Sequence, residues 1–260
     1  MSQSILKKIE NGVARLTFNR PEVFNSFNRE MALLLQKELD ACANDSTVRA
    51  IVLMGSGKAF CAGQDLKEVT DPALNPGFKK ILEEHYNPII TRIRAIEKPI
   101  VAAVNGVAAG AGANIALACD IVIAHEKVSF IQAFSKIGLV PDSAGTFFLP
   151  RLIGFGKASA LMMLGDKISA TDAEKMGMIY KVTTLDDFQT EIHTIAGTLA
   201  QMPTKALGMT KRLLNQSMSN TLEQQLELES KLQIEAASSE DYAEGVAAFV
   251  EKRKPNFKGK

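Results

Sequence analysis

Three uninterrupted runs of apolar residues constrain the fold of this chain more than any other feature. They lie in AIVLM at 50–54, IVAAV at 100–104 and DIVIA at 120–124. Each run is as long as a typical strand, and continuous apolar strands are expected where both faces of a sheet are covered. Such sheets are usually parallel and carry helices on their faces. The sequence therefore predicts an α/β fold around a buried parallel sheet.

Helical patterns separate these runs. Asn28 precedes apolar residues at helical spacing and is a suitable N-cap. A second apolar helical face extends from Phe78 to Ile93 and is expected to break or kink near Pro88. We therefore expect repeated strand–helix units wound around one core.

The pattern changes to helix beyond about residue 150, where KVTTL at 181–185 is the only late strand candidate. SATD at 169–172 and TLEQ at 221–224 have the spacing of a capping box. We predict a mixed core over residues 1–200 and a helical C-terminal region over residues 201–260. That region is expected to cover either its own core or a neighbouring subunit.

The composition excludes several classes of partner. Thirty basic residues balance twenty-nine acidic ones, so the net charge of +1 offers no field that would recruit nucleic acid or an anionic membrane. The longest apolar stretch, 99–124, contains Asn105, Asn114 and Asp120, which argue against a membrane span. The N-terminus lacks the apolar segment of a signal peptide. The three cysteines are scattered without metal-ligand spacing, so we expect reduced thiols, no metal and a cytoplasmic protein.

Two cofactor and nucleophile motifs fail on inspection. GAGAN at 110–114 has two glycines of a dinucleotide-binding loop, but Ile115 occupies the place of the third. PDSAG around Ser143 has Pro141 where a nucleophile elbow requires glycine. The sequence predicts no bound cofactor.

Two loops rich in small residues each follow a buried strand. They are SGKAFCAGQDL at 56–66 and NGVAAGAGAN at 105–114. Small residues allow a ligand to approach the backbone closely. Two such loops facing one another could each supply one N–H group to a single carbonyl oxygen, which is the design of an oxyanion hole.

Five segments in order resemble the crotonase (enoyl-CoA hydratase/isomerase) superfamily: KAFCAGQDLKE, KPIVAAVNGVAAGAGAN, ACDIVIA, GLVPDSAGT and FVEKRKPNFKGK. The resemblance implies a spiral of ββα turns with a helical C-terminal region, assembled as trimers or dimers of trimers. It also implies acyl-CoA thioesters as substrates, so that CoA enters as part of the substrate. By position, the oxyanion donors would be the backbone N–H groups of Gln64 and Ala111. The residues implied near CoA are Val23, Ala62, Asp65, Leu66, Lys67, Phe257 and Lys260.

The chain departs from the hydratases of this superfamily at two positions. Hydratases use two glutamates to activate water, and here those positions hold Asn114 and Phe134. Without a general base and a general acid, the addition of water to a double bond is not expected. Asn114, Phe134 and Tyr86 are instead predicted to line the pocket.

Asp142 is the carboxylate that remains. In isomerase branches of the superfamily, an acid at this position carries a proton from one carbon to another. The alternative is that Asp142 only caps a helix that begins near Ser143.

The segments 133–154 and 164–182 most resemble the branch that converts the ring 1,2-epoxide of phenylacetyl-CoA to an oxepin in phenylacetate degradation. That branch also shifts 3-enoyl-CoA to 2-enoyl-CoA. Three readings stay open beside it: a hydratase, a fatty-acid Δ3,Δ2-enoyl-CoA isomerase and a non-catalytic acyl-CoA-binding homologue. A second crotonase of the phenylacetate pathway is a candidate partner.

Overall fold

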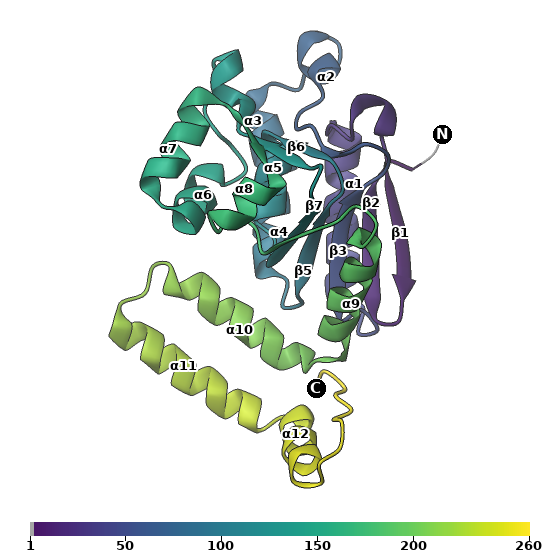
Figure 1. Ribbon diagram of the computed structural model, residues 1–260, viewed down its shortest axis with the longest axis vertical. Helices are drawn as coiled ribbons and strands as arrows, with labels where there is room; N and C mark the ends of the chain where they lie inside the picture. Colours follow the sequence, from purple (N-terminus) through teal and green to yellow (C-terminus); the bar gives the residue numbers. More distant parts are fainter. Residues whose placement is uncertain (1–2) are drawn as a thin grey trace.

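The larger of two sheets contains the three apolar runs. The computed structural model describes residues 3–260. Six strands pair in the order β1-β2-β3-β5-β7-β10, antiparallel between β1 and β2 and parallel elsewhere (Figure 1). Their bounds are β1 Ile5–Glu10, β2 Val13–Phe18, β3 Ala50–Gly55, β5 Ile100–Val104, β7 Ile121–His125 and β10 Lys181–Thr183.

A second, four-stranded sheet lies beside the first and has the order β4-β6-β8-β9. Its strands are β4 Ala59–Cys61, β6 Val107–Ala109, β8 Ser129–Ile131 and β9 Lys167–Ser169. Along the chain, β3 is followed by β4, β5 by β6 and β7 by β8, and each pair then leads into a helical segment. This repeated ββα unit confirms the predicted fold class.

Helices cover both sheets and form the C-terminal part of the chain. Three have the predicted side-chain caps: Asn28 before α1, Ser169 before α8 and Thr221, in a full capping box, before α11. The α-helices are α1 Arg29–Asn44, α2 Leu66–Thr70, α3 Phe78–Lys80, α4 Asn87–Ala95, α5 Ala111–Leu117, α6 Gly145–Ile153, α7 Phe155–Leu164, α8 Ala170–Lys175, α9 Phe188–Gln201, α10 Thr204–Ser217, α11 Leu222–Ala237 and α12 Glu240–Val250. The 3₁₀ helices η1 Pro21–Val23 and η3 Ala133–Ile137 and the π-helix η2 Ile81–Tyr86 complete the set.

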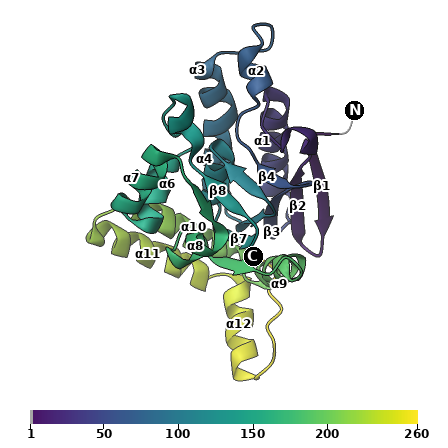
Figure 2. The ribbon, with the colours of Figure 1, turned by 45° about the horizontal axis from the view of Figure 1, so that its top comes forward.

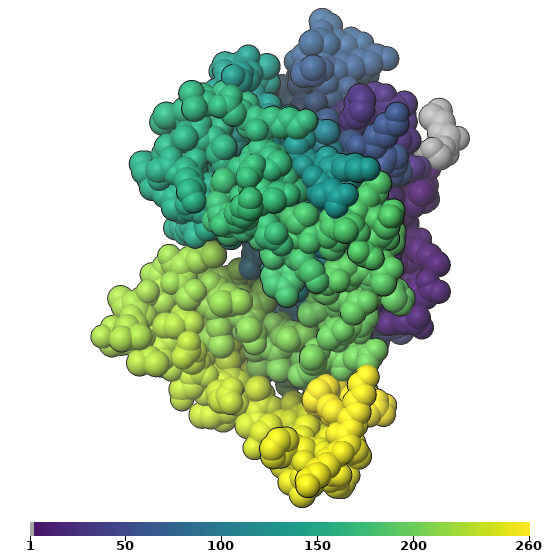
Figure 3. Space-filling view, in the orientation of Figure 1, coloured from purple at the N-terminus to yellow at the C-terminus, as the bar shows by residue number. Residues whose placement is uncertain are grey.

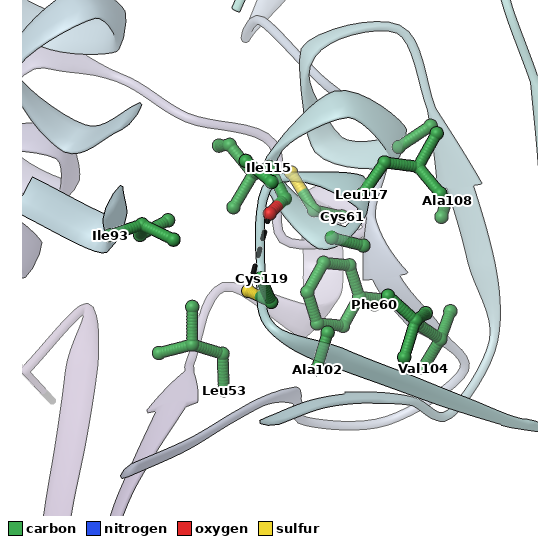
Figure 4. Packing of buried hydrophobic residues seen from close by; sticks show 14 of the residues in the cluster. Leu53, Phe60, Cys61, Ile93, Ala102, Val104, Ala108, Ile115, Leu117 and Cys119 are labelled. Carbon is green, nitrogen blue, oxygen red and sulfur yellow. Dashed lines mark hydrogen bonds between the residues drawn. The ribbon is translucent and has the colours of Figure 1, made fainter. Parts of the chain in front are cut away.

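Neighbouring side chains of the central strands enter two different cores, which explains the uninterrupted apolar runs. In β3, Ile51 and Leu53 belong to the main core, whereas Val52 belongs to a smaller one under α9. Phe188 and Ile192 of α9 cover this second face. Figure 4 shows part of the main core, where the buried thiols of Cys61 and Cys119 lie among aliphatic and aromatic side chains. Burial raises the pKa of the Cys61 thiol to about 12, as befits a core residue rather than a nucleophile.

Three local expectations need correction. The predicted loops at 56–66 and 105–114 contain the short strands β4 and β6, and β9 is a second late strand besides KVTTL. These strands have only three residues each, too few for a period-2 pattern. The irregularity near Pro88 is not a break but the π-helix η2, which runs directly into α4.

Helices α10, α11 and α12 project from one end of the molecule, opposite α2 (Figures 1 and 2). Polar contacts tie α10 to the core. Among them, Asp120 accepts from Lys211 of α10 at 2.8 Å and from Arg94 of α4 at 2.9 Å. The proposed boundary between residues 1–200 and 201–260 remains a prediction. Over residues 3–260, no helix has both the length and the apolar character that a bilayer crossing requires.

Candidate active site

A cavity of about 530 Å³ lies where the two loops of small residues meet the η2 helix and the segment that ends at Asp142. Seven of the residues predicted from the sequence line it: Ala62, Gln64, Leu66, Tyr86, Ala111, Phe134 and Asp142. These residues come from segments up to eighty positions apart. The structure thus brings the two predicted N–H donors and the predicted acid to one cavity.

The backbone geometry at Gln64 directs its N–H group toward the cavity side. Phe27 and Gln64 form an isolated parallel bridge, in which the Phe27 N–H donates to Gly63 O at 2.7 Å and the Asp65 N–H donates to Phe27 O at 2.8 Å. In such a bridge the peptide groups of Gln64 itself face away from Phe27. Within residues 3–260, the Gln64 N–H has no hydrogen-bond acceptor.

The second N–H group belongs to Ala111, the first residue of α5, where backbone donors lack intrahelical partners. The preceding residue, Gly110, has φ +53° and gives its own N–H to Ile131 O at 2.9 Å. A Cβ atom on Gly63 would lie 3.1 Å from Ala109 O and 3.6 Å from the Ala111 nitrogen. Glycine at 63 therefore allows the two loops to approach and places both free N–H groups beside the cavity.

Among the described residues, Asp142 is the only acidic one that lines this cavity. Burial raises the pKa of its carboxyl group, and the hydroxyl of Ser143, which donates to Oδ1 at 2.8 Å, partly opposes that shift. The capping alternative is wrong. Helix α6 begins at Gly145, its N-cap residue is Ala144, and no side chain accepts from its free N–H groups.

Asn114 does not line the cavity, contrary to the prediction. Its side chain is fully buried behind the cavity wall, where Nδ2 donates to the main-chain carbonyl of Asp142 at 2.9 Å. Its Oδ1 accepts from Gln132 Nε2 at 2.8 Å. A polar residue near the start of a helix has the same appearance in a sequence whether it faces a cavity or supports it from behind, so the sequence could not distinguish the two.

Tyr86 and Gln64 are linked through their side chains. The Tyr86 hydroxyl donates to Gln64 Oε1 at 2.9 Å, and Gln64 Nε2 donates to Glu68 Oε2 at 2.7 Å. Glu68 is buried and also accepts from the Arg29 N–H at 2.7 Å. These bonds fix the Gln64 side chain and with it the peptide that carries the free N–H. The sequence gives no signal for the contact between Glu68 and Arg29, which are 39 positions apart.

The remaining wall is apolar. Phe134 lines the cavity as predicted, and the sequence analysis missed six further residues: Val69, Phe78, Ile81, Ala133, Ile137 and Leu139. The sequence predicts Phe78 and Ile81 on one apolar helical face. Ile81 is buried as expected, whereas Phe78 is 52% exposed, and the pattern does not reveal a cavity. Lys136 also borders the cavity and is the basic residue among its lining side chains.

The predicted CoA residues divide into three groups. Ala62 and Leu66 line the cavity, and Lys67 is exposed next to Leu66 at the start of α2. Asp65 and Val23 do not line it. Asp65 caps α2 by accepting from the Lys67 N–H at 3.0 Å and pairs with Arg20 at 2.7 Å, so its carboxylate is structural. Val23 lies on η1, and the carbonyl of the next residue, Phe24, accepts a hydrogen bond from the Ala62 N–H.

Phe257 and Lys260 lie far from the cavity of their own chain. The Phe257 carbonyl accepts from Arg49 Nη1 at 2.8 Å, and the Lys260 carbonyl accepts from the Asp241 N–H at 3.2 Å. The first contact joins the tail to the residue that precedes β3, and the second joins it to α12, at the end of the molecule opposite α2 (Figure 3). Neither residue lines the cavity of its own chain, and their contact with CoA remains a prediction. Across residues 3–260, no three His, Cys, Asp or Glu side chains gather as metal ligands would.

Comparisons with known proteins agree with this architecture. The family model described as enoyl-CoA hydratase/isomerase matches residues 8–260. The 1,2-epoxyphenylacetyl-CoA isomerase of Escherichia coli K12 is 46% identical over 264 residues, covering 100% of both chains. The trans-2-decenoyl-acyl-carrier-protein isomerase of Streptococcus mutans is 36% identical and covers 99% of both.

Solved structures give the same result. An enoyl-CoA hydratase from Polaromonas sp. JS666 superposes with a TM-score of 0.90 at 34% identity, covering 97% of this chain and 99% of that one. An enoyl-CoA hydratase from Bacillus anthracis superposes with a TM-score of 0.92 at 30% identity, covering 99% and 100%. The likeness extends over the whole chain and includes both loops of small residues.

Proposed function

The chain belongs to the enoyl-CoA hydratase/isomerase family, and from this premise we propose that it is an isomerase of acyl-CoA thioesters that uses Asp142 as a proton shuttle. The observation that carries the proposal is one desolvated carboxylate in the same cavity as two backbone N–H groups that have no acceptor among residues 3–260. Glutamates are missing at the two positions where hydratases of the family hold them, Asn114 and Phe134. One acid is sufficient for moving a proton, whereas hydration requires a base for water and an acid for carbon.

The proposed reaction begins with the thioester oxygen held between the N–H groups of Gln64 and Ala111. These donors stabilise negative charge as it develops on that oxygen. Asp142 removes a proton from the carbon next to the thioester, and the resulting enolate is held by the two N–H groups. The protonated Asp142 then returns the proton at another carbon. The raised pKa of Asp142 brings it closer to the range in which a carboxyl group both accepts and donates a proton.

We propose the ring epoxide 2-(1,2-epoxy-1,2-dihydrophenyl)acetyl-CoA as a substrate that rearranges to oxepin-CoA, together with 3-enoyl-CoA thioesters that isomerise to 2-enoyl-CoA. Three aromatic side chains, Phe78, Tyr86 and Phe134, line a cavity of about 530 Å³ that is large enough for an aromatic ring. The name of the Escherichia coli relative supports the ring epoxide. No cofactor besides the CoA of the substrate enters this mechanism.

The chain is also proposed to work as a homotrimer or a dimer of trimers. Large apolar side chains on α11 and α12 are exposed in the single chain, among them Leu222 at 70%, Ile234 at 67% and Phe249 at 85%. Covering them would remove apolar surface from water. Phe257 and Lys260 would then contact CoA only in a neighbouring copy. A cytoplasmic location, supported by three free and buried cysteines, and a partnership with a second phenylacetate-pathway crotonase remain proposals.

The test is an Asp142→Asn variant assayed on both substrate classes. We expect turnover to fall by at least about 10²-fold because a positioned acid–base group is lost. Binding of a non-reactive acyl-CoA, measured by calorimetry, is expected to stay within about threefold because the N–H donors and cavity walls are unchanged.

The controls separate the alternative functions. Crotonyl-CoA hydration, followed by loss of absorbance, would reveal a hydratase. Turnover of linear 3-enoyl-CoA alone would assign the chain to fatty-acid isomerisation. Binding of acyl-CoA with no turnover by the wild type would identify a non-catalytic homologue. Full activity of Asp142→Asn would refute the shuttle.

A further inference from the structure

Two buried amide side chains, Gln132 after β8 and Asn114 on α5, connect to the main chain of the proposed acid, Asp142. Gln132 Nε2 donates to Asn114 Oδ1 at 2.8 Å, and Asn114 Nδ2 donates to the Asp142 carbonyl at 2.9 Å. The side chain of Gln132 is 3% exposed and that of Asn114 is 0% exposed. Neither amide lines the cavity, so neither contacts a substrate there.

The donor and acceptor roles in these two hydrogen bonds follow from the Asp142 carbonyl, at which they end. A main-chain carbonyl only accepts hydrogen bonds, so Asn114 must present its NH₂ group to Asp142 and its oxygen to Gln132. Gln132 must then present its own NH₂ group, which leaves its Oε1 buried without a partner within the described residues. A buried acceptor without a partner is costly, so this arrangement needs a compensating role.

The segment held by Asn114 has an unfavourable backbone. Ser143 has φ 50° and Ala144 has φ 57°, so two consecutive non-glycine residues occupy the left-handed region. Such conformations persist only where the surroundings enforce them. Besides the local bonds from Ser143 Oγ and the Gly145 N–H, the bond from Asn114 is the one hydrogen bond that ties Asp142 to a distant element within residues 3–260.

Gly145, the first residue of α6, packs directly against the Asn114 side chain. A Cβ atom at this position would lie 2.3 Å from Asn114 Nδ2. The first turn of α6 therefore lies directly on the Asn114 amide, and a larger residue would displace one of them. The strained turn at Ser143 and Ala144 is held between α6 and the Asn114 side chain, and Asp142 directly precedes this turn.

We infer that Asn114 and Gln132 are positioning residues, which anchor the strained turn through the Asp142 carbonyl and so fix the carboxylate opposite the two N–H donors. A carboxylate at position 114 would place a charged acceptor against the Asp142 carbonyl, and the anchor would be lost. On this view an amide at 114 belongs to a single-acid site, because it is the nearly isosteric group that donates instead of repelling. The inference rests on the proposed function for its catalytic meaning.

The experiment compares two variants that are nearly isosteric with the wild type. Asn114→Asp replaces the donor to Asp142 with an acceptor. Gln132→Met removes the donor that orients Asn114, together with the unpartnered Oε1 of Gln132. With a 3-enoyl-CoA substrate, we expect kcat to fall at least about 10-fold in Asn114→Asp and less in Gln132→Met, because small misplacement of a catalytic group lowers the rate steeply. KM is expected to stay within about threefold, since the cavity walls are unchanged.

Asn215→Asp is the matched control. The Nδ2 atom of Asn215 also donates to a main-chain carbonyl, that of Arg94, at 2.9 Å, but it lies on α10 outside the cavity. Its kcat is expected to equal that of the wild type within about twofold. If Asn114 only stabilised the fold, each variant would instead contain a smaller fraction of active enzyme, in proportion to its loss of stability.

Amide hydrogen exchange gives a readout that does not depend on turnover. The Gly145 N–H, which donates to the Asp142 carbonyl at 2.9 Å, is expected to exchange at least about 10-fold faster in Asn114→Asp and also faster in Gln132→Met. Wild-type kcat and exchange in both variants would overturn the inference. If Asn114→Asp does not fold, Gln132→Met decides alone. If the wild type shows no isomerase activity, the proposed function fails, and the exchange rates still decide whether the amides anchor the turn.

Discussion

The chemistry of Asp142 depends on the balance between two neighbours at the scale of single side chains. The apolar wall disfavours its charged form, whereas the Ser143 hydroxyl stabilises that form with a bond of 2.8 Å. The carboxyl group therefore keeps a pKa above its ordinary value of 3.8, but not as high as burial alone would give. Ser143 thus tunes the acid without contacting the proposed reacting carbons.

This balance predicts the pH dependence of activity. Asp142 must be ionised to remove a proton, so kcat/KM should fall as pH drops through its pKa, with a midpoint above 3.8. Ser143→Ala removes the bond that favours the ionised form, so we expect the acid limb to move to higher pH. The pH profile of both proteins measures the shift. An unchanged profile in Ser143→Ala would show that Asp142 does not control this limb.

The raised pKa of Asp142 also makes the stability of the folded protein depend on pH. A folded-state pKa above the unfolded value means that the neutral acid favours folding at low pH. This contribution is fully present below the unfolded pKa and is lost as pH rises through the folded pKa. At neutral pH the ionised Asp142 therefore opposes folding, which is a common feature of catalytic groups.

At the scale of elements, the attachment of α10 depends on a charge cluster around the buried Lys211. Lys211 is 6% exposed, and burial lowers its pKa, while Asp120 beside it opposes that shift. Asp120 also accepts from Arg94 and from the Ile100 N–H at 2.8 Å, so it joins α10, α4 and β5. Removing the shared anion leaves a buried cation without its counter-charge.

We therefore expect Asp120→Asn to destabilise the protein by about 2–3 kcal/mol, because it leaves the buried Lys211 without its counter-charge although Asp120 itself is partly exposed to solvent. Denaturant unfolding would measure it. Asp40→Asn is the control, because the Asp40–Arg92 pair is largely exposed and should contribute less than about 1 kcal/mol. Equal effects of the two substitutions would show that the Asp120 cluster does not carry the attachment of α10.

The elements also show what the sequence could predict. The apolar runs predicted β3, β5 and β7 because residues such as Leu53 and Val52 alternate between two cores, a pattern that leaves no polar positions. Strands β4, β6, β8 and β9 have three residues each, too few to show a period-2 pattern. Only the resemblance to a ββα spiral implied that second sheet.

The site was predictable to a similar degree. The positions of Gln64, Ala111 and Asp142 followed from motifs, and the structure brings them to one cavity. The supports of that cavity did not follow, because Arg29 binds Glu68 and Gln132 binds Asn114 across long sequence separations that the fold determines. Asn114 was assigned to the wrong side of the wall for the same reason.

At the scale of the whole molecule, the exposed apolar residues of α11 predict self-association. Leu226→Lys combined with Ile234→Lys should reduce the particle mass toward that of the 28.2 kDa chain, because charges would be buried in the contact. Light scattering after size exclusion measures the mass. Gln233→Lys, which adds a charge at an exposed polar position of the same helix, should leave it unchanged. A monomeric wild type would refute the proposed assembly.

The π-helix η2 determines which side chains form one wall of the cavity. Ile81 and Tyr86, five residues apart, both line it. In a regular α-helix a separation of five residues turns the second side chain by roughly 140° from the first, so the two would not share a face. The wider π turn brings them together. Insertion or deletion of a single residue here would therefore rotate one wall out of the cavity, which makes length variation in this helix a route to new acyl specificity that no point substitution offers.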